Sequence, residues 1–335
     1  MFFGKCDICT VKLFKQERIS VPEGLKMVRH LLKVSDFSKE ECLSIIDKSI
    51  EIKANISSHT SDLKDKTLLM LFEKPSLRTR TSFEVGMTQL GGHAIFYSIK
   101  DSPLGKKENI EDTAGCLSRY CDIIMARVFK KEDLQKLSEN STIPVINALD
   151  DFAHPCQILG DFQTIKEHKG DLNPRKMSYF GDCHNNVTYD LMRMCAILGW
   201  EMMVACPEGT EYEPEQSVLD EVAKLSEGTG AKISVTHDAQ EAAKDSDVIY
   251  TDSWMSYGIP EDEEQKRVDT FKPYQVTTEL LNVAKPDVIF MNCLPAKRGY
   301  EQTAEVIDGD KSIVFDEAEN RLHIQKSIML FLLEK

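Results

Sequence analysis

Residues 67–92 read TLLMLFEKPSLRTRTSFEVGMTQLGG, and they give the clearest indication of the fold class. The apolar run from Thr67 to Phe72 predicts a buried strand. A proline turn follows, and Ser76 is a natural N-cap for a helix that Gly91 and Gly92 would end. A buried strand that leads through a short turn into a helix is typical of α/β folds with parallel sheets.

The same alternation continues along the chain. Further short apolar runs begin at Ile123, Ile143, Met177, Met202, Val248 and Val288. Helical spacing of apolar residues lies between them, as at 40–52, 186–198 and 216–225. We therefore expect an α/β fold of two domains, each with a central parallel sheet flanked by helices, with the active site in the interdomain cleft.

The 335 residues are too many for one ordinary hydrophobic core. We expect a first domain at 1–150 and a second at 171–315. Residues 151–170 resemble a connecting helix, running from Asp151 to Lys169 with Pro155 in its first turn. Residues 316–335 are apolar at helical spacing, which predicts a terminal helix that packs back onto the first domain.

Composition excludes several classes of protein. The formal net charge of −14 disfavours a nucleic-acid partner, and no apolar run approaches the roughly 20 residues of a membrane span. The ten cysteines show no repeated spacing, so we expect reduced thiols and a cytoplasmic protein. Cys6 and Cys9 form a CxxC pair, but no second pair follows at zinc-site spacing, so we expect no metal site.

The helix predicted from Ser76 has the features of an anion site. Free backbone N–H groups, the hydroxyls of Ser76 and Thr79, and the guanidinium groups of Arg78 and Arg80 would suit a phosphate. Taken alone, the segment fits a capped surface helix with two solvated arginines better than an anion site.

Other polar residues gather where predicted strands end. Because ligands bind outside the carboxyl ends of parallel strands, these positions describe one cleft between the two domains. They are Arg127, His154 and Gln157 in the first half, and Asn185, Asn186, Asp252, Ser256 and Cys293 in the second.

Seven segments in this order resemble the aspartate/ornithine carbamoyltransferase family, and its ornithine branch most. They are FEKPSLRTRTSFE, ARV, HPCQ, GDCHNN, TDSWMSYG, NCLP and FDEAENR, and the resemblance runs from about His30 to the C-terminus. It implies that the amine of L-ornithine attacks carbamoyl phosphate directly, giving L-citrulline and phosphate in arginine metabolism. Carbamoyl phosphate is already activated, so no cofactor and no metal is expected.

The resemblance also assigns the site residues. The first domain would bind carbamoyl phosphate through Ser76, Leu77, Arg78, Thr79, Arg127, His154, Gln157 and Arg321. The second would bind ornithine through Asn186, Asp252, Ser256, Tyr257, Cys293 and Leu294. Arg127, His154, Cys293 and Asp252 would be catalytic, with a Cys293 thiolate or the Asp252 carboxylate favouring deprotonation of the amine.

Three positions depart from the family pattern. Asn292 stands in place of a histidine, and Tyr257 replaces the methionine of a Ser-Met-Gly acceptor loop. Pro103 lies where relatives reach across a subunit boundary, so the homotrimer, or multiple of trimers, is implied by resemblance alone.

Tyr257 leaves putrescine as an alternative acceptor, although Ser256 and Asn186 favour an amino acid. Aspartate is disfavoured because the loop presents Asp252. The alternative from a different class is a catalytically silent carbamoyltransferase-like binding module. GDCHNN lacks the three spaced glycines of a dinucleotide site, which disfavours a dehydrogenase. The sequence leaves open whether the reaction runs toward citrulline or toward carbamoyl phosphate in the cell.

Overall fold

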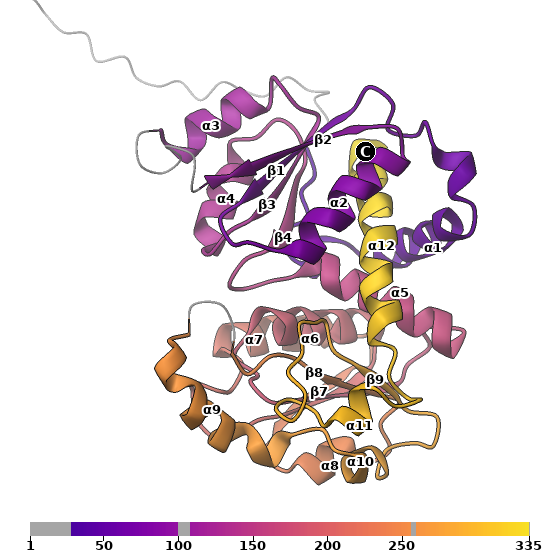
Figure 1. Ribbon diagram of the computed structural model, residues 1–335, viewed down its shortest axis with the longest axis vertical. Helices are drawn as coiled ribbons and strands as arrows, with labels where there is room; N and C mark the ends of the chain where they lie inside the picture. The colour runs from indigo at the N-terminus through magenta and orange to yellow at the C-terminus, as the bar shows by residue number, and fades with distance from the viewer. Residues whose placement is uncertain (1–27, 100–107, 256–258, 335) are drawn as a thin grey trace, which may run out of the picture.

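The computed structural model describes residues 28–99, 108–255 and 259–334. Cys6, Cys9, Pro103, Ser256 and Tyr257, on which predictions were made, lie outside these residues. Two parallel sheets form two lobes, joined by helices α5 (Pro155–Lys169) and α12 (Val314–Glu334), as Figure 1 shows. The predicted fold class is confirmed.

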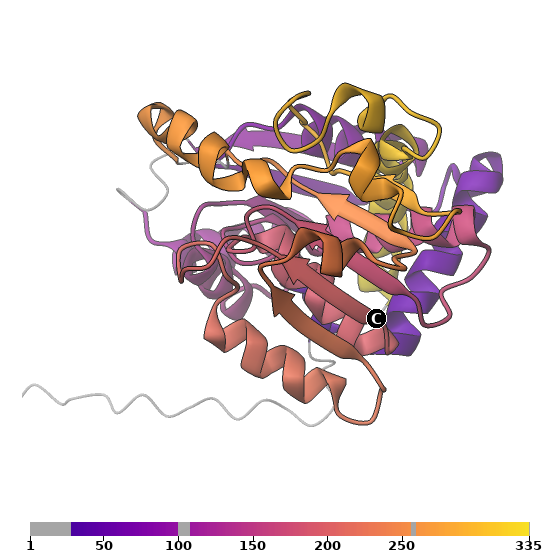
Figure 2. The same ribbon diagram turned by 90° about the horizontal axis from the view of Figure 1, so that it is seen from below.

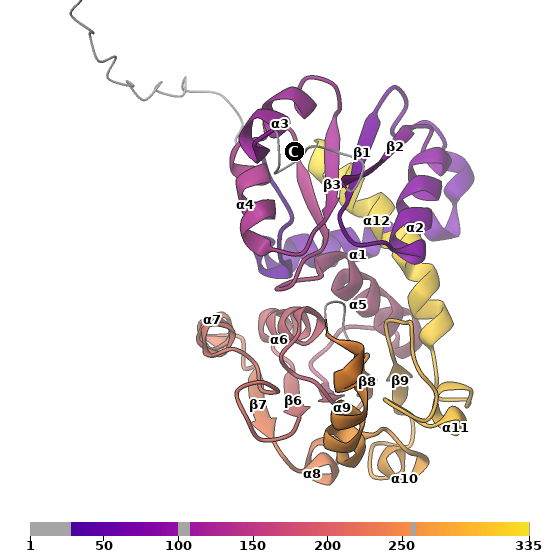
Figure 3. The same ribbon diagram turned by 60° about the vertical axis from the view of Figure 1, so that its left-hand side comes forward.

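The first sheet has the order β2-β1-β3-β4, with all pairs parallel. Its strands are β1 (Thr67–Phe72), β2 (His93–Ser98), β3 (Ile123–Arg127) and β4 (Val145–Leu149). Alternate side chains of β1 face opposite ways because a strand has a two-residue repeat. Leu68 and Met70 join the core under α1 (Lys39–Ala54), α2 (Leu77–Gln89), α5 and α12, whereas Leu69 and Leu71 pack with α3 (Ile110–Leu117) and α4 (Lys131–Glu139). The two groups of helices lie on opposite sides of this sheet in Figure 3.

The second sheet has the order β7-β6-β5-β8-β9, again parallel, and its strands fan out with a twist in Figure 2. Its strands are β5 (Lys176–Phe180), β6 (Glu201–Ala205), β7 (Lys232–Thr236), β8 (Val248–Thr251) and β9 (Ile289–Met291). Side chains from α6 (Asn186–Leu198) and α7 (Gln216–Ser226) join one core cluster with β5 and β6. The short helices α8 (Ala239–Ala243), α10 (Thr278–Leu281) and α11 (Ala304–Ile307) pack in another, with β8 and β9.

Five further short helices complete the described elements. The 3₁₀ helix η1 (Val34–Asp36) precedes α1, and α9 (Glu264–Phe271) follows η4 (Glu261–Glu263) near the second sheet. The 3₁₀ helices η2 (Ile56–His59) and η5 (Lys272–Tyr274) connect larger elements. In the part of the chain that the structure describes, no helix is long and apolar enough to cross a membrane.

The helix expected from Asp151 begins instead at Pro155. Asp150 turns the chain, because its carboxylate accepts hydrogen bonds from the backbone N–H groups of Phe152 (2.8 Å) and Ala153 (2.7 Å). Pro155 then occupies the first helical position, where its missing N–H costs nothing, and Gly170 ends the helix at a φ of 84°. This loop therefore places His154 directly before the first turn of α5 and not within the helix.

Candidate active site

The helix N-terminus predicted at Ser76 is present. The Ser76 Oγ accepts a hydrogen bond from the Thr79 backbone N–H at 3.2 Å, so Ser76 is the N-cap of α2. Arg78 and Thr79 line a cavity, and Leu77 does so with a side chain that is 80% exposed. Arg80 was expected to join the anion site, but this expectation is wrong. Its guanidinium group lies over the Phe96 ring and donates to Glu84, outside the cavity lining.

Four basic side chains line the same end of the cavity. Arg127 ends β3, Arg321 comes from α12, and Lys74 and Arg78 come from the turn between β1 and α2 and the start of α2. Lys74 is only 5% exposed, and burial, followed by the nearby Arg127, lowers its pKa. We refer to this end as the basic end. Its composition suits an anion.

His154 and Gln157 contribute polar groups to the basic end. Burial lowers the pKa of His154 well below its usual value, with Arg321 and Arg127 adding to the effect, so the imidazole is neutral. Arg321 donates from Nη1 to the Gln157 Oε1. The buried His154 Nδ1 and the Arg321 Nε and Nη2 have no hydrogen-bond partner among the described residues. Buried polar groups normally have partners, so this end suits a ligand with several polar atoms.

The end of the cavity that the second domain lines holds Asp252 and Cys293, which follow β8 and β9. The Cys293 Sγ donates a hydrogen bond to Asp252 Oδ1 at 3.1 Å. Burial, followed by the adjacent Asp252 charge, raises the pKa of the Cys293 thiol well above its usual value. This direction, together with the hydrogen bond to Asp252, favours a neutral Cys293 donor over the expected thiolate. Burial also raises the pKa of Asp252, an effect that the bond from Cys293 opposes.

Asn186 and Leu294 complete this end. Asn186 is the first residue of α6, directly after the N-cap Asn185, whose side chain accepts from Thr188 N. Leu294 has a φ of 55°, which turns the chain after β9. Asn292 points away from the cavity: its Nδ2 donates to Gln302 (3.0 Å) and its Oδ1 accepts from the Leu294 N–H (2.8 Å).

All of these groups lie in one cavity of about 1010 Å³ between the two sheets. Each predicted site residue that the structure describes contributes to its lining: Ser76, Leu77, Arg78, Thr79, Arg127, His154, Gln157, Asn186, Asp252, Cys293, Leu294 and Arg321. Ser256 and Tyr257 fall outside the described residues. Acidic side chains line the end with Asp252, which we call the acidic end; they are Asp182, Glu211, Asp252, Glu261, Glu264 and Glu301. Its two basic neighbours are already paired, Arg267 with Asp182 and Lys297 with Glu264.

A buried polar cluster lies behind Gln157, and sequence reasoning missed it. Gln157 Nε2 donates to Asp161 (2.8 Å) and to Glu317 (3.2 Å), and the Tyr250 hydroxyl donates to the same two carboxyl groups. Glu317 also accepts from the Asn292 N–H at 3.0 Å. This cluster links the basic end to the turn that carries Cys293.

Lys74 was missed as well. Lys74 lies two residues after the buried strand β1. The argument applied to Arg127, that polar residues at strand ends line the cleft, could therefore have identified it. Among the described residues, no cluster of three His, Cys, Asp or Glu side chains could hold a metal ion.

The two parallel-sheet domains and their two-ended cleft define a two-substrate α/β enzyme. A family model described as the carbamoyl-P binding domain of aspartate/ornithine carbamoyltransferase matches residues 29–167, and the Asp/Orn binding domain of the same family matches residues 173–332. The chain belongs to the aspartate/ornithine carbamoyltransferase family.

Individual relatives agree. The chain is 49% identical to the ornithine carbamoyltransferase of Methanosarcina acetivorans over 92% of this chain and 100% of the relative. The solved structure of ornithine transcarbamoylase from Giardia lamblia has a TM-score of 0.85 and 43% identity, with 92% of this chain and 99% of that one covered. That of the Pyrococcus furiosus ornithine carbamoyltransferase also has a TM-score of 0.85, at 45% identity, with 90% and 96% covered.

Proposed function

We propose that this chain transfers the carbamoyl group of carbamoyl phosphate to the side-chain amine of L-ornithine, giving L-citrulline and phosphate. The observation that carries the proposal is that the first domain and α12 bring Lys74, Arg78, Arg127 and Arg321 to the same cavity as a group of carboxyl side chains of the second domain, although Asp150 and Asp151 also line it. Carbamoyl phosphate is an anion, and the ornithine side chain is a cation in water, so each end attracts one substrate. The names of the relatives support ornithine as the acceptor.

The first domain binds the donor in this proposal. Ser76, Thr79 and the Leu77 backbone at the start of α2, with Arg78, bind the phosphate, since a helix N-terminus offers free N–H groups and a favourable dipole. Arg127, His154, Gln157 and Arg321 surround the carbamoyl end. The exposed Leu77 side chain fits a role for its backbone alone.

The reaction forms one bond and breaks one. The amine nitrogen attacks the carbamoyl carbon, a C–N bond forms, and the C–O bond to phosphate breaks with its electron pair on the leaving phosphate. Arg127, the neutral His154 and the Thr79 hydroxyl stabilise the negative charge that develops on the carbonyl oxygen. The amine must first lose a proton, because its ordinary pKa is about 10.4. Asp252 accepts this first proton, and the departing phosphate accepts the second proton, which the nitrogen loses once the C–N bond has formed.

The second domain binds the acceptor. Asp252 and Cys293 receive the side-chain amine, with the Cys293 thiol orienting the Asp252 carboxylate through the 3.1 Å hydrogen bond. Asn186 and Leu294 contact the rest of the amino acid, as do Ser256 and Tyr257 from the loop outside the described residues.

We place the protein in the cytoplasm as a homotrimer or a multiple of trimers. None of the eight cysteines that the structure describes forms a disulfide, as expected in a reducing compartment. Tyr120, at 78% exposure, is a large apolar side chain that an assembly would cover. Light scattering coupled to gel filtration measures the subunit number, and a monomer would overturn the trimer.

Transfer to L-ornithine, putrescine and L-aspartate, measured in parallel as phosphate release and carbamoylated product, tests the function. We expect strong preference for ornithine; preference for putrescine would change the acceptor, and no transfer would support the silent binding module. Arg78→Ala should lower kcat/KM for carbamoyl phosphate by roughly 10²- to 10³-fold. Arg80→Ala is the matched control, because Arg80 is two residues away but pairs with Glu84, and it should retain activity.

A further inference from the structure

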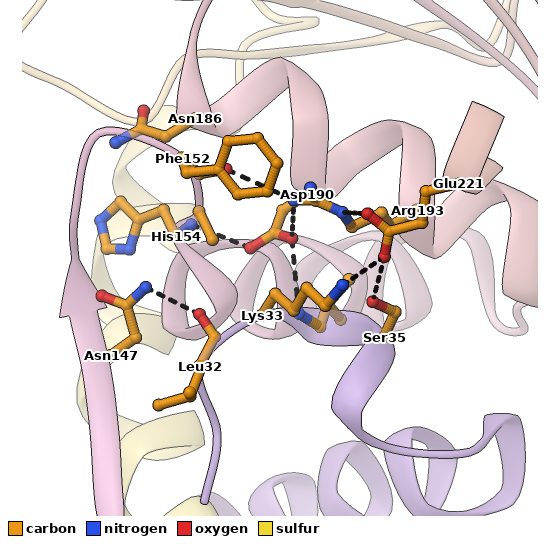
Figure 4. A network of polar contacts seen from close by, with 12 residues as sticks. Leu32, Lys33, Ser35, Asn147, Phe152, His154, Asn186, Asp190, Arg193 and Glu221 are labelled. Atoms are coloured by element: carbon orange, nitrogen blue, oxygen red, sulfur yellow. Dashed lines mark hydrogen bonds and ion pairs between the residues drawn. The ribbon is translucent and has the colours of Figure 1, made fainter. Parts of the chain in front are cut away.

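Two side chains of α6, from the second domain, hold the loop of residues 150–154 that carries His154. The Asp190 Oδ2 accepts a hydrogen bond from the His154 backbone N–H at 2.8 Å. Arg193 donates from Nη1 to the Phe152 carbonyl at 3.3 Å, and its guanidinium group lies over the Phe152 ring at 4.6 Å. Both side chains are completely buried, and Figure 4 shows them between the loop and α6.

A third contact comes from the same face of α6. The Asn186 Nδ2 donates to the Asp150 carbonyl. Asn186, Asp190 and Arg193 are spaced by four and three residues, which sets them in one stripe along a helix. The helix that presents Asn186 to the acceptor end thus also holds both ends and the middle of the loop that ends at His154.

Asp190 and Arg193 are also held by contacts that do not involve the His154 loop. Arg193 donates to Asp190 Oδ1 at 2.9 Å and to Glu221 Oε2 at 3.1 Å. Glu221, on α7, also accepts from Lys33 Nζ (2.6 Å) and Ser35 Oγ (2.9 Å), from the segment that precedes α1 (Figure 4). Of these two acids and two bases, Asp190 and Arg193 are buried and pair with each other, whereas Lys33 and Glu221 are partly exposed. The arrangement therefore fixes Asp190 and Arg193 from three separate chain segments.

We propose that Asp190 and Arg193 are positioning residues for His154, so that a helix of the acceptor domain sets the geometry of a donor-binding group. The proposal rests on the proposed carbamoyl transfer for its kinetic consequence. Asp190 and Arg193 do not line the cavity, so they act through the loop and not on substrate. His154 is the N-cap residue of α5 and its side chain forms no cap hydrogen bond. The Asp190 contact to its backbone is therefore the specific restraint at this point of the chain.

A second buried acid offers a matched control. Asp247 is 3% exposed, accepts from the Lys176 backbone N–H at 2.9 Å and from Lys285 Nζ at 2.8 Å, and lies outside the cavity lining. It precedes β8, at the end of the second sheet opposite the cleft. Asp190→Ala and Asp247→Ala each remove a buried acid that caps a backbone N–H and pairs with a base. Only Asp190 contacts the His154 loop.

The experiment compares Asp190→Ala, Asp190→Asn and Asp247→Ala by thermal unfolding, kcat and KM for both substrates, and the NMR signals of the His154 ring, assigned with His154→Gln. We expect Asp190→Ala to lower kcat by roughly 10- to 100-fold, because small displacements of a reacting geometry have effects of this size. Asp190→Asn retains an oxygen that can accept from His154 N–H, so it should recover most of kcat while still losing stability beside Arg193. Asp247→Ala should lose stability but keep kcat and the His154 signals.

The outcomes separate the two proposals. If kcat falls in proportion to stability in all three variants, or if Asp190→Ala leaves kcat and the His154 signals unchanged, Asp190 is not a positioning residue. If the wild-type protein transfers carbamoyl to no acceptor while Asp190→Ala alone shifts the His154 signals, the proposed function fails and the positioning of His154 stands.

Discussion

Replacing Asp161 by asparagine should make the free energy of unfolding less dependent on pH. Asp161 is completely buried beside Glu317, and both accept from Tyr250 and Gln157. Burial raises the pKa of Asp161 to about 7, and burial with the nearby Asp161 raises that of Glu317 well above its usual value. An asparagine at 161 can still accept a hydrogen bond from Gln157 and can donate one to Glu317. The variant therefore keeps these hydrogen bonds, but residue 161 no longer binds or releases a proton.

The sign follows from proton binding. The folded-state pKa of Asp161 lies above its unfolded value of about 3.9, so the folded state binds more protons between these two values. Its contribution to stability is fully present below about pH 4 and is lost as the pH rises through 7. At 1.36 kcal/mol per pKa unit, the wild-type protein should lose about 2 kcal/mol relative to Asp161→Asn between pH 5 and pH 7.

Urea unfolding at several pH values measures this difference. Tryptophan fluorescence is a suitable probe, because Trp200 packs against Phe162, next to Asp161, with ring centroids 5.1 Å apart. The double variant Asp161→Asn with Glu317→Gln should remove any dependence that remains from the pair. A difference between wild type and Asp161→Asn that stays constant from pH 5 to pH 7 would refute the reasoning.

Three further outcomes are expected. Ser76→Ala removes the cap of α2, so it should lower the free energy of unfolding by about 1 kcal/mol and raise KM for carbamoyl phosphate more than KM for ornithine; an unchanged donor KM would exclude Ser76 from phosphate binding. Cys293→Ser, which keeps a donor to Asp252, should retain more kcat than Cys293→Ala, and equal loss in both would argue against the orienting role in steady-state assays. Inorganic phosphate at 100 times the Kd of the wild-type protein should stabilise that protein by about 2.7 kcal/mol in thermal unfolding. At the same phosphate concentration the gain should be smaller for Arg78→Ala and unchanged for Arg80→Ala.

The fold was predictable where strands are buried on both sides. TLLMLF forms β1 because five of its six residues are buried, and an apolar run is a clear signal. The edge strands β2 and β7 were missed. Their side chains are intermediate or exposed and none is buried, so neither HAIFYS, despite its four apolar residues, nor KISVT has the doubly buried character of the strands that were recognised.

The residues of the site could be predicted from the sequence, but the protonation states of its titratable groups could not. Resemblance identified Cys293 and Asp252, yet a sequence does not reveal the burial and the adjacent Asp252 carboxyl group that raise the pKa of the Cys293 thiol. Arg78 and Arg80 look alike in SLRTR, and only the helix turn separates the one that lines the cavity from the one that pairs with Glu84.

The polar clusters behind the site were not predictable at all. Glu317 contacts Gln157 across 160 residues, and Asp190 contacts the His154 N–H across 36. No local pattern indicates a partner so far along the chain. These contacts arise only once α5, α6 and α12 have packed together.

Helix α12 follows the second domain in the chain but packs on helices of the first, and this arrangement has a consequence for biosynthesis. Arg321 and Glu317 belong to α12, which packs on α1, α2 and α5, all of which precede it in the chain by more than 140 residues. A nascent first domain therefore lacks both the guanidinium group at its basic end and the carboxyl group behind Gln157. The carbamoyl phosphate site is therefore completed only after α12 has been synthesised, so a chain that stops before α12 would lack one side chain that lines the site and one that lies behind it.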